Sequence, residues 1–298
     1  MCFPRTISHM PSVAIMDELD PIARNILQEA GITVLSPERY TEAEAVIVRS
    51  RTKVDRKFMD SAPRLRLVVR AGVGLDNVDL AYARERGITV KNTPQATVVS
   101  VAELAIGLMI AAARHIPRAH SSTKAGLWEK KKLKGIELHG KVLGVVGMGR
   151  IGRAVAERAK CFGMEVVYYD LVDVPGYRKV DLPELFSTAD VVSLHLPLNE
   201  NTRGIINYDL MKRMKEGAIL INTARGGLIP TEDLVRVLEE GKITVALDVY
   251  EEEPPPPHLL KYPNLIATPH IGAQTREAQR RAAEEAARIV VEFFNAGA

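Results

Sequence analysis

The sequence contains little that is typical of secreted or membrane proteins. Its two cysteines, Cys2 and Cys161, are too few and too far apart for a disulfide framework, which favours a reducing compartment such as the cytoplasm. The longest apolar stretch, from Leu104 to Ala113, is too short to cross a bilayer, and the first residues carry no signal-peptide pattern. We therefore expect a cytoplasmic protein without a membrane partner.

A large excess of charge is also absent. The chain has 40 Lys and Arg against 37 Asp and Glu, a formal net charge of +3, so no nucleic-acid partner is expected. No metal site is predicted. What is present is ordinary for a soluble globular protein, with 46% hydrophobic and 26% charged residues. A length of 298 residues is enough for two modest domains.

Short apolar runs alternate with amphipathic stretches, a pattern typical of βαβ units and parallel sheets. In the first part of the chain we expect a helix after Pro21 and another over Leu80–Arg86. A long apolar helix should follow from Val98 to His115, and Pro117 should kink or end it. The strands expected in this part are Val13–Ile15, Ile32–Leu35, Ala45–Val48, Leu67–Val69 and Thr89–Val90.

A second βαβ series begins at Lys141 and contains six strand candidates, the number in a full dinucleotide-binding sheet. Residues Pro254–Pro257 should form a stiff loop, and Arg276–Phe294 an amphipathic helix. The six expected strands are Val142–Val146, Val166–Tyr169, Val191–Leu194, Ile219–Asn222, Val245–Leu247 and Leu265–Ala267.

The first strand of this second series runs into a glycine-rich turn, Gly147-x-Gly149-x-x-Gly152, after which a helix is expected. In such a turn the glycines allow a tight bend, a close approach of the backbone to a pyrophosphate, and close packing of helix on strand. Asp170 ends the next strand, where a carboxylate can bind ribose hydroxyls and repel the extra phosphate of NADP. The pattern predicts NAD as the cofactor.

Three polar residues follow neighbouring strand candidates and should lie at the ligand-binding edge of the sheet: Arg225, Glu253 and His270. Their chemistry suits oxidation of a 2-hydroxy acid. His270 can accept the hydroxyl proton, Glu253 can orient the imidazole, and Arg225 can hold the substrate carboxylate. Each residue alone has a simpler interpretation as a structural or solvated group, but their joint placement favours catalysis.

Several motifs resemble those of the D-isomer-specific 2-hydroxy acid dehydrogenases: GMGRIG, NTARGG, ALDVYEEEP and PHIGA, preceded by RAGVGLDNVDL and NTPQATVVSVAEL. The resemblance covers residues 45–290 and is nearest to the members that act on D-3-phosphoglycerate. It implies an α/β fold of two Rossmann-like domains with parallel sheets. A discontinuous flavodoxin-like substrate domain (1–93 and 274–298) would then flank an inserted NAD-binding Rossmann domain (94–273).

The resemblance also implies site residues beyond the three catalytic ones. His195 would lie on the cofactor side and would not be the base. Expected cofactor contacts are Val73, Gly147, Gly149, Arg150, Ile151, Gly152, Asp170, His195, Leu196, Thr223, Ala224, Asp248, His270, Gly272 and Ala273. Expected substrate contacts are Gly72, Val73, Gly74, Arg225 and His270, with the loop around Gly72 offering backbone N–H groups.

A phosphorylated substrate needs further cations. Arg49, Arg51 and Arg70 lie at expected strand ends and are candidates for binding its phosphate, with solvated surface charge as the alternative. The expected reaction is NAD-dependent oxidation of D-3-phosphoglycerate to 3-phosphohydroxypyruvate, the first step of serine biosynthesis. The alternatives are a glyoxylate or hydroxypyruvate reductase, another D-2-hydroxy acid dehydrogenase, or an NAD-sensing corepressor-like binding protein.

Four smaller expectations remain. A homodimer or homotetramer is implied by the resemblance. Pro230 stands where family members often carry an acid, and should affect only the start of the following helix. The chain ends soon after Phe294, which suggests that no regulatory domain follows and no serine feedback acts through one, and Met10 is an alternative start to Met1.

Overall fold

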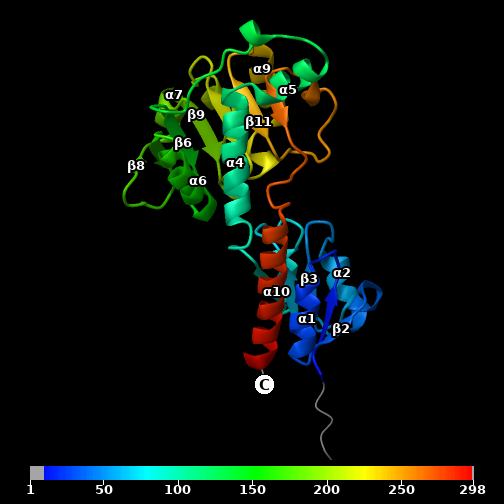
Figure 1. The fold of residues 1–298 in the computed structure, drawn as a ribbon. Helices are drawn as coiled ribbons and strands as arrows, with labels where there is room; N and C mark the ends of the chain where they lie inside the picture. Colours follow the sequence, from blue (N-terminus) through cyan, green and yellow to red (C-terminus); the bar gives the residue numbers. More distant parts are fainter. Residues whose placement is uncertain (1–9, 297–298) are drawn as a thin grey trace, which may run out of the picture. The chain divides into compact units, whose positions relative to one another are not determined.

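The first sheet has five strands, all parallel, in the order β2-β1-β3-β4-β5 (Figure 1). This is the flavodoxin-like order, and it follows from near-continuous Val, Ile and Leu runs that are buried on both faces of the sheet. The computed structural model describes residues 10–296. The strands are β1 (Ser12–Ile15), β2 (Thr33–Leu35), β3 (Ala45–Val48), β4 (Leu67–Arg70) and β5 (Thr89–Asn92).

Helices cover both faces of this sheet. On one face the long helix α10 (Arg276–Ala296) packs beside α1 (Ile22–Glu29), the red and blue helices of Figure 1. Fully buried alanines of α10, such as Ala283 and Ala287, allow this close approach. The other face is covered by η1 (Pro37–Glu42), α2 (Arg56–Ser61) and α3 (Leu80–Glu85).

The second sheet has seven parallel strands in the order β12-β11-β10-β9-β6-β7-β8. All six predicted strands are present, so the Rossmann-like prediction is confirmed. A two-residue edge strand, β8 (Arg178–Lys179), is the addition, and it is too short to leave a pattern in the sequence. The others are β6 (Val142–Val146), β7 (Glu165–Tyr169), β9 (Val191–Leu194), β10 (Ile219–Asn222), β11 (Thr244–Leu247) and β12 (Leu265–Ala267).

Two hydrophobic cores cover the faces of the second sheet. On one face lie α4 (Val98–Ala113) and α6 (Arg150–Cys161). On the other lie α7 (Leu182–Thr188), α8 (Tyr208–Met211) and α9 (Thr231–Glu240). The remaining short segments are α5 (Ile116–Lys124), η2 (Lys130–Lys132), η3 (Gly226–Leu228) and η4 (Leu259–Lys261).

The break after the apolar helix α4 differs from the prediction. Helix α4 ends at Ala113, and His115 adopts a left-handed conformation (φ 52°) before α5 begins at an angle of 63°. Pro117 was predicted to make this break but lies in the first turn of α5, where its missing N–H costs nothing. No single helix in residues 10–296 is long and apolar enough to span a membrane; α4 and α5 reach that threshold only as a bent pair.

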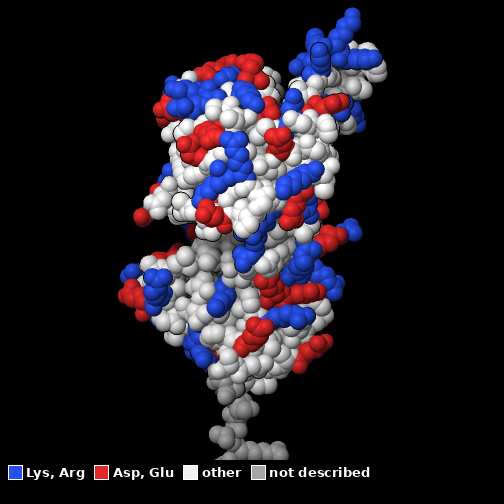
Figure 2. Space-filling view, turned by 90° about the vertical axis from the view of Figure 1, so that its left-hand side faces the viewer, with Lys and Arg blue, Asp and Glu red and all other residues white. Residues whose placement is uncertain are grey.

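The chain divides into two compact units. The first contains residues up to Thr97 and those from Ala273 onward, and the second runs from Val98 to Gly272. The predicted boundaries lay at 93/94 and 273/274, so the two divisions differ by four residues and by one. On the face drawn in Figure 2, basic and acidic side chains are interspersed, in keeping with the nearly even count of the two signs.

Candidate active site

The glycine-rich turn after β6 has the geometry of a dinucleotide site. Gly147 has φ +97°, and a Cβ there would lie 2.8 Å from the carbonyl carbon of His195. A Cβ on Gly152 would lie 2.1 Å from the carbonyl oxygen of Gly147, so helix and turn touch. Around Gly149, by contrast, no atom lies within 4 Å of such a Cβ. That open space lies at the start of α6, where the first-turn N–H groups have no partner within the helix, and it suits a pyrophosphate.

Asp170 follows β7 and reaches back to this turn. Its Oδ2 accepts a hydrogen bond from the Met148 N–H at 2.7 Å, and its Oδ1 accepts one from the Val172 N–H at 3.2 Å. A carboxylate oxygen has more than one acceptor site, so ribose hydroxyls can still bind. The arrangement therefore fits NAD, which has no phosphate on that ribose.

Other predicted cofactor residues lie in the loops next to the turn. His195 and Leu196 follow β9, and Thr223 and Ala224 follow β10, while Arg150 and Ile151 begin α6. The chain reverses its strand order between β6 and β9, where open α/β sheets bind ligands. Among residues 10–296 no hydrogen-bond partner reaches the buried Thr223 Oγ1 or His195 Nδ1.

His195 is neutral near physiological pH. Its Nε2 lies 2.8 Å from Ser193 Oγ, and burial of the ring lowers the pKa of His195 to about 4. A group with so low a pKa is a weak proton acceptor at neutral pH. This supports the interpretation that His195 is not the base.

His270 and Glu253 form the expected pair. The imidazole Nδ1 lies 2.8 Å from Glu253 Oε2, although the two residues are 17 positions apart. Half of the His270 side chain is exposed, so the ring is open to a ligand. With Nδ1–H bonded to the carboxylate, Nε2 is the nitrogen that can accept a proton.

Asp248 holds the turn that carries His270. Its Oδ1 accepts hydrogen bonds from the Ile271 N–H at 2.8 Å and from Thr268 Oγ1 at 2.7 Å. Its Oδ2 accepts one from the Gly272 N–H at 2.8 Å. These bonds fix His270 in a left-handed conformation (φ 54°) that residues with a side chain seldom adopt. Asp248 was expected to contact the cofactor, and that role remains a prediction.

Arg225 belongs to the same edge of the sheet. The strand pairs Asn222–Leu247 and Leu247–Ala267 are in register, so the loops after β10, β11 and β12 begin at one level. Buried Asn222 shapes the Arg225 turn, since its Nδ2 donates to the Arg225 carbonyl at 2.9 Å. Three side chains with acid, base and anion-binding chemistry thus leave adjacent strand ends.

The three candidates for binding the substrate phosphate, Arg49, Arg51 and Arg70, all belong to the first unit. Arg51 Nε lies 3.3 Å from Asp17 Oδ1, and the Arg49 N–H donates to Asp17 Oδ2 at 2.6 Å. Burial alone would raise the pKa of Asp17. The hydrogen bonds from Arg49, Thr52 and Arg51 together outweigh burial, so the pKa of Asp17 lies below its usual value. The Arg70 guanidinium folds over Gly72, where a Cβ would nearly coincide with it. Val73, Gly74 and Ala273 also belong to this unit.

Sequence reasoning missed Asp17, Tyr250 and Glu251, which hold these loops. Asp17 follows the first strand, so its position at a strand end was a usable signal. Tyr250 and Glu251 bond to residues far along the chain, and no local pattern indicates such partners. Within residues 10–296 no group of three or more His, Cys, Asp or Glu is placed to hold a metal ion.

The doubly wound sheet, the open glycine turn and the His270–Glu253 pair define the class of NAD-binding dehydrogenases. The family model described as "D-isomer specific 2-hydroxyacid dehydrogenase, NAD binding domain" matches residues 106–272. The chain belongs to the D-isomer specific 2-hydroxyacid dehydrogenase family, as its motifs predicted, and its second unit is the NAD-binding domain of that family.

Relatives within the family carry two different names. The chain is 51% identical to the hydroxypyruvate reductase of Thermotoga maritima, over 90% of this chain and 94% of that one. It is 46% identical to the D-3-phosphoglycerate dehydrogenase of Methanocaldococcus jannaschii, over 92% of this chain but only 55% of that one. It also resembles the solved structure of NAD+-bound 3-phosphoglycerate dehydrogenase from Entamoeba histolytica, with a TM-score of 0.83 and 32% identity over 97% of both chains.

Proposed function

We propose that the protein is an NAD-dependent dehydrogenase that oxidises D-3-phosphoglycerate to 3-phosphohydroxypyruvate. The observation that supports dehydrogenase chemistry most strongly is the 2.8 Å bond between His270 Nδ1 and Glu253 Oε2, at the same sheet edge as Arg225 and the glycine turn. The chain spans about half the length of the phosphoglycerate dehydrogenase from M. jannaschii, so its activity as a whole is part of this proposal.

Each residue of the edge has a defined task. His270 takes the hydroxyl proton of the substrate at Nε2, and Glu253 stabilises the imidazolium that results. Arg225 holds the substrate carboxylate with its planar guanidinium, so carbon 2 is fixed in one orientation. When bound in the glycine turn, NAD supplies the hydride acceptor. In the reverse direction His270 returns the proton to the keto oxygen.

The phosphorylated substrate is favoured by the cations of the first unit. Arg49 follows β3 and Arg70 ends the neighbouring strand β4, where Val48 and Arg70 are in register. The Asp17 carboxylate orders the turn that carries Arg49 and Arg51. Guanidinium groups held in this way suit the binding of a phosphate.

A hydroxypyruvate reductase is the second candidate, because the T. maritima relative of that name matches over nearly its whole length. The test is a substrate panel: NADH formation with D-3-phosphoglycerate, D-glycerate, D-lactate and 2-hydroxyglutarate, and NADH consumption with hydroxypyruvate and glyoxylate. We expect the highest kcat/KM with phosphoglycerate, coupled to removal of its keto product. A preference for an unphosphorylated acid would exclude the phosphate assignment and leave the chemistry at His270 in place.

An NAD-sensing binding protein is the non-enzyme alternative, and one variant separates it from the enzyme. His270→Asn suits the left-handed backbone, because Asn tolerates positive φ, but it lacks a basic nitrogen. We expect turnover to fall by about a thousandfold, in the range of general-base removal, while NADH affinity stays within about twofold. Unchanged turnover would show that His270 is not the base.

We include assembly as a homodimer or homotetramer in the proposal. In the loop after α5, Leu127 is 55% exposed and Trp128 is 83% exposed. Neighbouring large apolar side chains that are exposed in this way often belong to a protein interface. The molar mass in solution, measured by light scattering during gel filtration, tests this part. A monomer at micromolar concentration would contradict it.

A further inference from the structure

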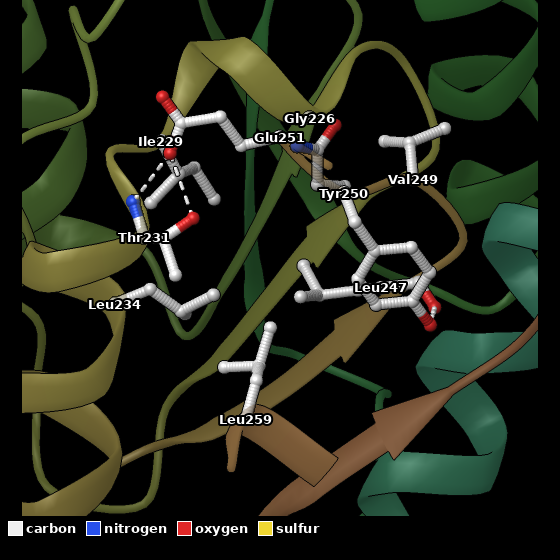
Figure 3. A pocket seen from close by; sticks show the side chains of 10 residues that line it. Gly226, Ile229, Thr231, Leu234, Leu247, Val249, Tyr250, Glu251 and Leu259 are labelled. Carbon is white, nitrogen blue, oxygen red and sulfur yellow. Dashed lines mark hydrogen bonds between the residues drawn. The ribbon is translucent and has the colours of Figure 1, made fainter. Parts of the chain in front are cut away.

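Three consecutive glutamates in the loop after β11, Glu251, Glu252 and Glu253, have different contacts. All three are exposed, but Glu253 bonds His270. Glu251 turns toward α9, and its Oε2 accepts hydrogen bonds from the Thr231 N–H at 3.0 Å and from Thr231 Oγ1 at 2.7 Å (Figure 3). This contact joins residues 20 positions apart and connects the loop after β11 to the start of a helix.

Helix α9 depends on an acceptor from outside its own sequence. The first N–H groups of a helix have no partner within it, and Ser, Thr, Asp or Asn usually supplies one from the N-cap position. Here that position is Pro230, which has no side-chain oxygen. Glu251 takes over this task, and its charge is also favourable at the positive end of the helix. The two bonds from Thr231 lower the pKa of Glu251, so the carboxylate stays ionised.

The same loop is tied to the His270 strand by Tyr250. The phenol donates to the Thr268 carbonyl at 2.9 Å, two residues before His270. The backbone N–H of Tyr250 donates to Glu253 Oε1 at 3.2 Å. Burial, together with the charges of Asp248 and Glu253, raises the pKa of Tyr250 to about 12, so its hydroxyl stays protonated and continues to donate.

The Arg225 loop packs directly against this segment. A Cβ on Gly226 would lie 1.8 Å from the carbonyl carbon of Tyr250 and 2.4 Å from the nitrogen of Glu251. The cavity next to the contact measures about 10 Å³ and is lined by Tyr250, Leu247 and Leu259 among others (Figure 3). That is about the space of one water molecule, so the loop has little room to shift.

We infer that Glu251 is a positioning residue, which acts through the Thr231 contact to hold the loop of Glu253 against the Arg225 loop and so keeps Glu253 on the His270 ring. This inference rests on the proposed function, because it assigns the His270–Glu253 pair to proton transfer. The hydrogen bonds of Glu251 go to Thr231, and within residues 10–296 none joins it to Glu253 or His270.

The test compares Glu251→Ala, Glu251→Gln and the matched control Glu252→Ala, which removes the same charge one residue away. Reduction of phosphohydroxypyruvate and of hydroxypyruvate by NADH gives kcat and KM, and NADH fluorescence gives the cofactor affinity. We expect Glu251→Ala to lower kcat about tenfold, as for a small misplacement of a catalytic group, with NADH affinity unchanged. Glu251→Gln keeps an acceptor oxygen and should stay within about twofold of the wild type, as should Glu252→Ala.

A role limited to helix stability would lower the melting temperature of Glu251→Ala and leave the kcat of the folded protein unchanged, and that result would overturn the inference. If Glu251→Ala does not fold, Thr231→Val removes only the hydroxyl bond and should lower kcat about threefold. His270→Asn is measured in the same assay. Full activity of His270→Asn removes the assignment of proton transfer to the His270–Glu253 pair, whereas an inactive His270→Asn beside a fully active Thr231→Val and Glu251→Ala removes only the positioning role.

Discussion

At the scale of single residues, His270 shows how a strained conformation can be kept. A left-handed backbone costs on the order of 1–2 kcal/mol for a residue with a side chain, so its neighbours must hold it there. Asp248 accepts hydrogen bonds from Ile271 and Gly272 on the C-terminal side of the turn and from Thr268 on its N-terminal side. The conformation directs the imidazole toward Glu253, and the pair is therefore set before a ligand arrives.

His195 gives a prediction for stability against pH. Its pKa of about 4 in the folded protein lies below the unfolded value of 6.5, so below pH 6.5 the unfolded chain binds a proton that the folded protein does not. The contribution of His195 to the free energy of unfolding should be fully present above pH 6.5. It should decrease toward pH 4, by at most roughly 1.4 kcal/mol per pH unit.

Urea unfolding between pH 7.5 and 4.5 measures this effect when wild type and His195→Gln are compared. The variant should lose less stability than the wild type on acidification, because Gln does not titrate. Carboxylates with lowered pKa values, such as Asp17 and Asp190, lose stability only at lower pH and affect both proteins equally. Parallel curves for the two proteins would contradict the burial of a neutral imidazole.

At the scale of elements, a substitution in the turn between β6 and α6 should affect cofactor binding without affecting stability. Gly149 has open space where a Cβ would point, so Gly149→Ala should leave the unfolding free energy within about 0.5 kcal/mol of the wild type. The added methyl group would occupy the space proposed for the pyrophosphate, and NADH affinity should fall at least about tenfold, or ~1.4 kcal/mol.

Fluorescence titration with NADH and urea unfolding test both halves of this prediction. Gly107→Ala in α4 is the control, because a Cβ there also meets nothing within 4 Å. It should keep the cofactor affinity and raise stability by up to about 1 kcal/mol through helix propensity. Unchanged NADH affinity in Gly149→Ala would mean that the turn does not hold the pyrophosphate.

The helices and strands also show which parts of the fold could be predicted from the sequence alone. Strands buried on both faces, such as Ala45–Val48 and Ile219–Asn222, were predicted with their bounds because short apolar runs between turn signals are typical of them. Residues 178–179 pair with β7 through tertiary context that no local pattern encodes. The bend at His115 depends on one residue with positive φ, and Pro117 gave the stronger but misleading signal.

The candidate site divides in the same way. Glycine spacing and strand-end polar residues predicted Gly149, Asp170 and the His270–Glu253 contact, since parallel strands end at one edge. Pro230 was expected to affect only the start of its helix. The structure shows why more depends on it: the acceptor it lacks comes from Glu251, 20 positions after Thr231 in the chain. The sequence alone does not show that a residue so far along the chain supplies the helix cap.

At the scale of the whole molecule, substrate choice should depend on cations of the first unit. Arg49→Gln and Arg70→Gln should raise KM for D-3-phosphoglycerate at least about tenfold, since a hydrogen bond to a charged group contributes about 1.5–3 kcal/mol. KM for D-glycerate, which lacks the phosphate, should change by less than about twofold. Steady-state kinetics with both acids measures the difference.

Arg66→Gln is the matched control, because Arg66 precedes β4 whereas Arg70 ends it. Its guanidinium lies near Glu44, at 3.8 Å, and its loss should affect neither acid. Equal increases in KM for both acids in Arg49→Gln and Arg70→Gln would show that these residues do not recognise phosphate.

The packing of α10 against α1 determines which of the two units can fold first during synthesis. The second unit has all of its residues once Gly272 has been synthesised, whereas the first sheet lacks the cover of one face until Arg276–Ala296 has emerged. Domains form as units during synthesis. The NAD-binding unit can therefore be folded while Ala23, Leu27 and their neighbours are still exposed to solvent because α10 does not yet cover them. During that interval we expect the nascent protein to be most accessible to chaperones and proteases.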